Sequence, residues 1–335
     1  MLLVGFRGLA VDANHPIVQD IRRRNLGAVV LFDYDVPNRS PVRNIQSPQQ
    51  LTGLVSSLQS FSATPVIVAT DEEGGEIARL NPRDGFPATV SAQELGSKND
   101  VTLTYRHASA IARMLRETGI NLNLAPVVDL DVNPSNPIIG KLGRSFSADP
   151  QVVTRNALEF IRAHHDLGVL CTLKHFPGHG SSAQDSHLGF VDVTNTWSRA
   201  ELEPFANVIA AGQADAVMTA HIFNAKLDPQ YPATLSERII GGVLRGQLKY
   251  SGVVISDDMQ MGAISAHYGL ETAVERAILA GVDILSFANN SVFEEDIVAR
   301  VTDLIRRLVG EGRISEGRID ESYRRIRALK ARIRI

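Results

Sequence analysis

Cysteine, aromatic residues and an excess of charge of either sign are all scarce in this sequence of 335 residues. Cys171 is the only cysteine, which excludes an internal disulfide and suits a reducing compartment, so we expect a cytoplasmic protein. The formal net charge is only −3, so no basic bias points to nucleic acid. No apolar run reaches the roughly 18 residues that a membrane span needs. We therefore expect an ordinary globular protein whose partners include neither nucleic acid nor a membrane.

The first residues also lack the pattern of a secretion signal. The segment Met1–Val11 is apolar, but it is short, has no cationic region before it and is interrupted by Arg7. Its apolar part, Leu2–Phe6, is better interpreted as a first β-strand. Because this strand starts almost at the terminus, we expect the natural chain to begin upstream of Met1.

Hydrophobic residues make up 44% of the sequence, which is enough for one large core. Short β-branched apolar runs alternate with stretches of helical period, and no break in composition divides the chain. The expected strands are Leu2–Phe6, Ala28–Phe32, Pro65–Thr70, Asn121–Ala125, Val169–Lys174, Ala216–Ala220, Gly252–Ser256 and Val282–Phe287. The expected helices are Ile17–Asn25, Pro48–Ser60, Val101–Thr118, Pro150–Leu167, Arg199–Gly212, Glu237–Gln247, Leu270–Ala280, Glu294–Val309 and a last one over Ser315–Ile333.

Eight strands with eight following helices predict an α/β fold of the (β/α)8, TIM-type barrel class, here with an extra C-terminal helix. A doubly wound open sheet shows the same alternation and is the alternative. Polar residues just past six strands favour the barrel, because a closed ring brings all six to one mouth. They are Asp71, Asp129, Lys174 with His175, His221, Asp257 with Asp258, and Asn289. We predict a single catalytic barrel over residues 1–335 with its site at this mouth.

The motif richest in chemistry lies in one of three long loops at that mouth, which are 33–47, 127–149 and 176–197. Lys174–Gly180 has the sequence KHFPGHG and is followed by Asp185-Ser186-His187. A histidine paired with a carboxylate is a good proton carrier, because the carboxylate fixes the tautomer and stabilises the imidazolium. Asp185 and His187 could form that pair; the alternative is two solvated loop residues.

Carboxylates at two other strand ends are candidates for contact with a sugar. Asp257 could attack an anomeric carbon; the alternative is a helix N-cap, and both hold if Asp258 is the capping residue. Asp71 could bind two sugar hydroxyls, with Arg79 bracing it or binding the ligand; the alternative is a turn with an ion pair. Arg144 could bind a hydroxyl or an acyl carbonyl, unless it is a solvent-facing cation.

The histidines also raise the question of a metal. Potential ligands are His175, His179, His187, His221 and Asp257. Barrel metallohydrolases of comparable type carry a His-x-His pair at the first strand, where this sequence has Val4–Gly8 without a ligand. We therefore expect no metal and no other cofactor.

Taken together, these residues resemble glycoside hydrolase family 3, in particular its NagZ-type β-N-acetylglucosaminidases (β-N-acetylhexosaminidases). The likeness covers nearly the whole chain, and its histidine-loop signature is specific to this branch. It rests on Asp71-x-Glu73-Gly74-Gly75 with Arg79, Asn123–Asp129, Gly143–Phe146, Lys174–Gly180 with Asp185–His187, Met218–His221 and Ser256–Met259.

The resemblance implies roles for single residues. Asp257 would be the nucleophile of a retaining double displacement, His187 the general acid and then base, and Asp185 its orienting partner. The residues that would bind the sugar are Asp71, Arg79, Arg144, Lys174, His175 and, from the Met218–His221 motif, His221. The β-glucosidases of the family carry their acid/base on a second domain, so a lone barrel has to supply its own acid.

Two segments depart from the family pattern. Glu72 and Glu76 stand where similar sequences often have Gln and Arg, which makes this stretch more acidic. The loop from Asp33 to Ile45 is unlike the short segment expected there, so contacts from that side stay open.

The resemblance implies an O-glycosyl hydrolase that removes terminal N-acetylglucosamine from small N-acetylglucosaminides and, in peptidoglycan recycling, from muropeptides. Three alternatives stay open. The first is a phosphorylase, because a neutral histidine repels an incoming phosphate less than a carboxylate does. The others are a β-glucosidase or other hexosidase of the same fold, and a sugar-binding barrel without catalysis.

Overall fold

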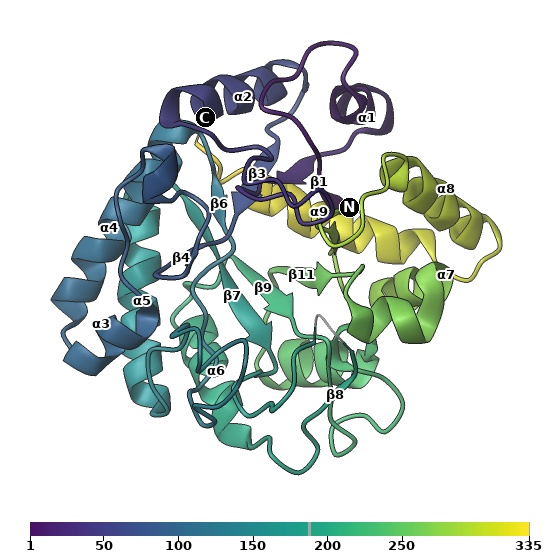
Figure 1. Ribbon diagram of the computed structural model, residues 1–335. Helices are drawn as coiled ribbons and strands as arrows, with labels where there is room; N and C mark the ends of the chain where they lie inside the picture. Colours follow the sequence, from purple (N-terminus) through teal and green to yellow (C-terminus); the bar gives the residue numbers. More distant parts are fainter. Residues whose placement is uncertain (187–188, 335) are drawn as a thin grey trace.

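A closed barrel of eight parallel strands forms the centre of the computed structural model, which describes residues 1–186 and 189–334. The strands run in the order β1-β12-β11-β9-β7-β6-β3-β2, and β1 (Leu2–Gly5) closes the ring on β12 (Ile284–Phe287). Figure 1 shows the helices arranged around this ring. The open sheet is excluded and the predicted barrel class is confirmed.

The barrel strands coincide with the eight predicted apolar runs. Besides β1 and β12, they are β2 (Ala28–Val30), β3 (Ile67–Thr70), β6 (Leu122–Asn123), β7 (Leu170–Phe176), β9 (Ala216–Thr219) and β11 (Val253–Asp258). Leu3, Ile67 and Ile255 belong to a hydrophobic cluster that fills the ring, whereas the next residues along, such as Val4 and Val68, pack against the helices. This alternation is the period of two that a β-strand imposes.

Amphipathic helices cover the outside of the ring, as the helical periods predict. They are α1 (Pro16–Arg24), α2 (Pro48–Ser60), α4 (Val101–Thr118), α5 (Pro150–Asp166), α6 (Glu203–Ala210), the π-type helix η4 (Arg238–Gln247), α7 (Gly262–Ala280), α8 (Ile297–Gly310) and α9 (Glu316–Lys330). Ser47, Asp100 and Asp149 cap α2, α4 and α5, since their side chains accept hydrogen bonds from backbone N–H groups of the first turn.

The final helix, α9, closes the N-terminal end of the barrel. Ile326 and Leu329 of this helix join the cluster that fills the ring. Ser322 Oγ donates a hydrogen bond of 2.7 Å to Asp283, which immediately precedes β12. The extra helix is therefore part of the barrel core rather than an addition to its surface.

Several short elements were not predicted because they are too short to show a period. They are α3 (Ala92–Lys98), the hairpin of β4 (Glu72–Gly74) and β5 (Ile77–Ala78), the pair of β8 (Val191–Asp192) and β10 (Ile222–Phe223), and the 3-10 turns η1 (Pro82–Asp84) and η3 (Ala233–Leu235). The predicted helix Arg199–Gly212 begins as the 3-10 turn η2 (Arg199–Leu202) and continues as α6. Helix α7 also begins earlier than expected, at Gly262, with a break at Gly269, whose φ is 66°.

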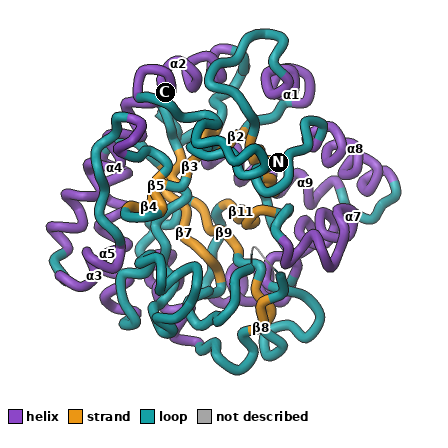
Figure 2. Tube along the Cα trace, in the orientation of Figure 1, coloured by secondary structure: helices purple, strands orange, loops and turns teal. Residues whose placement is uncertain are grey.

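The long loops lie at the C-terminal ends of the strands, where Figure 2 shows them over the barrel. The hairpin β4–β5 and the strand β8 also belong to this end, since they follow β3 and β7 directly. Within the described ranges, no helix has the length and apolar character needed to cross a bilayer.

Candidate active site

A pocket of about 280 Å³ opens at the C-terminal ends of the strands. Six of the predicted site residues line it together: Asp71, Arg79, Arg144, Lys174, His175 and Asp257. Asp71, Arg79 and Arg144 come from segments that follow β3 and β6, whereas Lys174, His175 and Asp257 lie in the last residues of β7 and β11. The closed barrel brings these strand ends to one opening. Ser186, which directly precedes His187, also lies on the pocket wall, whereas His187 lies outside the described residues.

Two cations are fixed at the pocket by one buried carboxylate. Lys174 Nζ lies 2.6 Å from Asp71 Oδ1 and 2.6 Å from Glu73 Oε1. The Arg144 guanidinium binds both oxygens of Glu73, at 2.7 and 2.8 Å. Burial alone would raise the pKa of Glu73, but the charges of Arg144 and Lys174 hold this pKa far below its usual value. Glu73 therefore stays ionised, and its negative charge compensates the positive charges of Lys174 and Arg144.

Glu73 is the functional residue whose role the sequence reasoning missed. The sequence shows it only as one position of the Asp71-x-Glu73 motif, and no local pattern identifies it, because its partners Lys174 and Arg144 are distant in sequence. The side chain is only 7% exposed and is not among the residues that line the pocket, so Glu73 acts behind Lys174 and Arg144.

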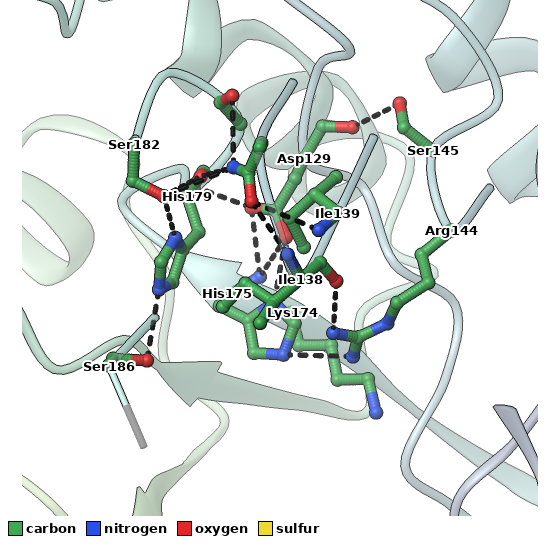
Figure 3. Close-up of polar contacts among 12 residues, drawn as sticks. Asp129, Ile138, Ile139, Arg144, Ser145, Lys174, His175, His179, Ser182 and Ser186 are labelled. Carbon is green, nitrogen blue, oxygen red and sulfur yellow. Dashed lines mark hydrogen bonds and ion pairs between the residues drawn. The ribbon is translucent and has the colours of Figure 1, made fainter. Parts of the chain in front are cut away.

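His175 is oriented by a buried aspartate on the neighbouring loop. Its Nδ1 lies 2.7 Å from Asp129 Oδ2, and the backbone N–H groups of His175 and His179 donate to the same carboxylate (Figure 3). Burial alone would raise the pKa of Asp129, but His175 lowers it. With Nδ1 donating to Asp129, Nε2 is the acceptor that faces Arg144 Nη2 at 3.4 Å. Asp129 thus fixes both the ring and the start of the loop.

A second network ties the histidine loop to the loop that follows β6. His179 Nδ1 lies 2.7 Å from Ser182 Oγ, and Nε2 lies 3.2 Å from Ser186 Oγ (Figure 3). Asn136 Nδ2 donates to the carbonyl of His179 at 2.8 Å and to Ser182 Oγ at 3.0 Å. Burial lowers the pKa of His179 to about 4, so the ring is neutral near pH 7. His179 is thus a neutral link between the loops.

Asp257 and Asp258 are the last two residues of β11. Asp257 faces the pocket, and the side chain of Asp258 holds the strand end in place. The backbone N–H of Asp258 donates to Asp257 Oδ1 at 2.8 Å. Asp258 Oδ1 accepts from the backbone N–H groups of Gln260 and Ala288, at 3.1 and 3.0 Å. The predicted capping role of Asp258 is wrong, because the N-cap of α7 is Met261. Asp258 instead joins the end of β11 to the segment after β12.

His221 lies beneath this strand end and is not among the residues that line the pocket. It is 1% exposed; its Nε2 donates to the carbonyl oxygen of Asp258 at 2.9 Å, and its Nδ1 lies 2.8 Å from Thr234 Oγ1. Its ring therefore supports the Asp257–Asp258 segment from below.

Arg79 lines the pocket, but its guanidinium does not bind the Asp71 carboxylate. One of the two interpretations of the sequence predicts that contact. Its guanidinium pairs with Asp33 at 3.7 Å, on the loop after β2, and lies over the Phe32 ring. Lys174 binds the Asp71 carboxylate instead, and the backbone N–H of Arg79 donates to the carbonyl oxygen of Asp71 at 3.2 Å.

Glu72 does not make the site more acidic, which corrects the interpretation of this departure from the family pattern. The residue is fully buried in the β4–β5 hairpin, where Glu72 Oε2 accepts from the backbone N–H of Leu80 at 2.8 Å. Burial raises its pKa to about 8, so the side chain is protonated at neutral pH. A protonated glutamate is neutral and nearly the shape of a glutamine side chain, with one O–H donor in place of the two N–H donors of the amide.

Potential metal ligands are dispersed among these networks. Among the residues with described positions, no group of three or more His, Cys, Asp or Glu side chains could hold an ion together. His175 and His179 are instead bound to Asp129 and to two serines.

Comparison with known proteins now identifies the family. Residues 3–329 match the glycosyl hydrolase family 3 N terminal domain. The chain belongs to glycoside hydrolase family 3. It is 35% identical over 309 residues to a β-hexosaminidase of Stenotrophomonas maltophilia, a match that covers 89% of the chain and 86% of that relative. It is 33% identical over 340 residues to β-hexosaminidase A of Pseudoalteromonas piscicida, covering 93% of the chain and 54% of that protein.

Solved structures of family 3 members have the same barrel. A β-N-acetylglucosaminidase from Paenibacillus sp. str. FPU-7 is 37% identical with a TM-score of 0.90, covering 99% of the chain and 61% of that protein. A β-N-acetylhexosaminidase from Beutenbergia cavernae is 28% identical with a TM-score of 0.87, covering 98% and 96%. The family 3 chain described here thus spans little more than half of some relatives and nearly all of others.

Proposed function

We propose that this family 3 barrel is an exo-acting β-N-acetylglucosaminidase, an O-glycosyl hydrolase that retains the configuration of the sugar by double displacement. The observation that carries the proposal is the shared pocket of Asp257 with Asp71, Arg144, Lys174 and His175. A carboxylate at a strand tip beside fixed cations and acceptors is what attack on a bound sugar requires. The names of the relatives, β-hexosaminidase and β-N-acetylglucosaminidase, favour an N-acetylated sugar.

Asp257 is the proposed nucleophile. The hydrogen bond from the backbone N–H of Asp258 orients its carboxylate at the pocket wall. In the first step Asp257 forms an ester with the anomeric carbon while the bond to the leaving oxygen breaks. In the second step water attacks the same carbon and the carboxylate departs, so two inversions give net retention.

His187 is the proposed acid and base, with Asp185 as its orienting partner. This role rests on the sequence motif and on the position of Ser186 at the pocket wall. The imidazolium gives its proton to the leaving oxygen in the first step, and the neutral ring then takes a proton from the attacking water. The carboxylate of Asp185 would stabilise the charged ring before the first step and after the second, while the ring is neutral in the glycosyl-enzyme between them.

The remaining residues divide into those that touch the sugar and those that support them. Asp71 offers acceptors for sugar hydroxyls, and Lys174, Arg144 and Arg79 offer donors. His175 presents Nε2 in a fixed orientation because Asp129 binds its other nitrogen. The family resemblance implies that His221 binds the sugar. We propose instead that His221 positions Asp257, because its Nε2 donates to the carbonyl oxygen of the adjacent Asp258.

The natural substrates are proposed to be small N-acetylglucosaminides, including muropeptides, as the family resemblance implies. The cytoplasm is the proposed compartment, because the one cysteine is a free buried thiol.

The proposal is tested by comparing 4-nitrophenyl β-N-acetylglucosaminide and the β-glucoside, each with and without inorganic phosphate. We expect hydrolysis of the N-acetylated sugar, no sugar 1-phosphate, and a loss of at least about 1,000-fold in kcat for Asp257→Asn. Wild-type turnover by Asp257→Ala would refute the mechanism. Phosphate-dependent release of sugar 1-phosphate would make the enzyme a phosphorylase, and preference for the glucoside would make it a β-glucosidase.

A further inference from the structure

Most of the exposed large hydrophobic side chains lie at the end of the barrel where the pocket opens. In the described part of the chain they are Tyr34, Val36, Val132, Phe190, Leu279, Val292 and Tyr323. Five of these seven lie on the loops that follow β2, β6, β7 and β12, whereas Leu279 and Tyr323 lie on α7 and α9. Val36 is the one of them that lines the pocket, and Tyr34 is two residues before it on the same loop. A single exposed apolar residue is ordinary, but exposed apolar side chains beside a pocket can form part of a contact surface.

Tyr34 and Val36 belong to the loop that departs from the family pattern, and they are held firmly. Val36 is 51% exposed and lines the pocket, as does Asn290 from the segment after β12. Asn290 Oδ1 accepts from the backbone N–H of Val36 at 3.2 Å, and its Nδ2 donates to the carbonyl of Tyr34 at 3.1 Å. The loop after β2 is therefore fastened to the loop after β12, which lies on the other side of β1 in the ring.

The residue between them anchors the loop from below. Asp35 is 3% exposed and pairs with Arg7 at 2.6 Å and with Arg43 at 3.0 Å. The hydrogen bond from Arg7 lowers the pKa of Asp35, which keeps the carboxylate charged. Arg43 Nη2 in turn donates to the carbonyl of Asn289 at 2.7 Å. Because Asp35 is bound beneath the loop, Tyr34 and Val36 keep their places before any ligand arrives, and little entropy is lost on binding.

The interior of the pocket differs in character from this rim. It holds the charged groups Asp71, Lys174, Arg144 and Asp257, and its volume of about 280 Å³ is at the lower end for small-ligand sites. A volume of this size suits a single sugar ring, and a group attached to the anomeric oxygen would then extend toward the opening, where Val36 is exposed.

We propose that Tyr34 and Val36 form an apolar platform for the leaving group, and that the enzyme prefers β-N-acetylglucosaminides whose leaving group carries a hydrocarbon surface, alkyl or aryl. The inference rests on the proposed glycosidase function and adds the class of leaving group to it.

The test is a series of methyl, propyl and hexyl β-N-acetylglucosaminides. The propyl and hexyl alcohols differ little in acidity, so the rate of bond cleavage is nearly constant and chain length reports contact with the rim. For the wild type we expect kcat/KM to rise with chain length, by up to about fourfold for each methylene that is fully buried. In Tyr34→Ser and Val36→Thr the ratio of kcat/KM for the hexyl glycoside to kcat/KM for the methyl glycoside falls toward one.

Tyr323→Ser is the matched control, because Tyr323 is an exposed tyrosine on α9, away from the pocket. It is expected to keep the wild-type dependence on chain length. The platform is overturned if kcat/KM of the wild type does not rise with chain length. It is also overturned if kcat/KM of the two variants rises as steeply with chain length as that of the wild type. Absence of turnover for every member, with 4-nitrophenyl β-N-acetylglucosaminide also inert, overturns the proposed function and the platform with it.

Discussion

Lys174 Nζ and Glu73 Oε1 lie 2.6 Å apart behind the wall of the pocket. The lysine is 2% exposed at its side chain and lines the pocket, whereas the glutamate does not. Glu73 also binds Arg144, so one buried anion sets the position of two cations. This arrangement separates the groups that would touch a sugar from the group that keeps them charged and in place.

Replacing that anion is expected to damage both binding and stability. Glu73→Gln keeps the size of the side chain but leaves Lys174 and Arg144 with less compensation, so the free energy of unfolding falls by about 3 kcal/mol. The cations also shift, and kcat/KM for the N-acetylglucosaminide falls by about 100-fold. Thermal unfolding and steady-state kinetics measure the two effects. Glu76→Gln, an exposed change on the same hairpin, is the control; equal behaviour of the two variants would contradict the anchoring role.

Glu72 is expected to make stability depend on pH in the opposite direction from most carboxylates. Burial raises its pKa from 4.5 to about 8, so between these values the folded chain holds a proton that the unfolded chain has lost. This contribution to stability is complete below pH 4.5 and is lost as pH rises through about 8. Glu72→Gln has no group that titrates at this position, so it does not lose stability in this way as pH rises. Its melting temperature is therefore expected to exceed that of the wild type by several degrees at pH 9 and to coincide nearly with it at pH 5. The same difference in melting temperature at both pH values would show that Glu72 is charged when buried.

His179 is expected to act as a positioning residue for the catalytic loop. Its ring bonds Ser182 and Ser186, so His179→Ala releases the segment that leads to the proposed acid/base while the cation network stays intact. We expect kcat to fall by at least about tenfold with little change in KM. Because the pKa of His179 is lowered to about 4, the limbs of the pH profile near neutrality stay where they are.

The variant His107→Ala, on the outer helix α4, serves as the comparison for His179→Ala. An unchanged kcat for His179→Ala, or a displaced pH profile with normal kcat, would remove His179 from the positioning network.

The strands and the mouth of the barrel were predictable because their signals are local and repeated. An apolar run that ends in a polar residue occurs at strand after strand, and closure of the ring brings Asp71, Lys174 and Asp257 together. The predicted sugar ligands Arg144 and His175 also line the pocket, since Arg144 lies on the loop after β6 and His175 lies at the end of β7.

Partners that are distant in sequence could not be predicted in the same way. Arg79 pairs with Asp33 rather than with the nearby Asp71, because the loop after β2 folds over the mouth. Asn136 binds the carbonyl of His179 across two loops, and neither residue has a period or motif that links it to the other. Glu72 and Glu73 are adjacent, yet burial keeps Glu72 protonated whereas contact with Lys174 and Arg144 keeps Glu73 charged.

Among the described residues, helix α9 closes one end of the ring, because Ile326 and Leu329 join the side chains that fill it. The pocket that holds Asp257 opens at the opposite end. In the proposed double displacement the alcohol departs when the glycosyl-enzyme forms, water then enters, and the free sugar leaves last. Substrate, water and both products would therefore exchange through the same end of the barrel, in that order.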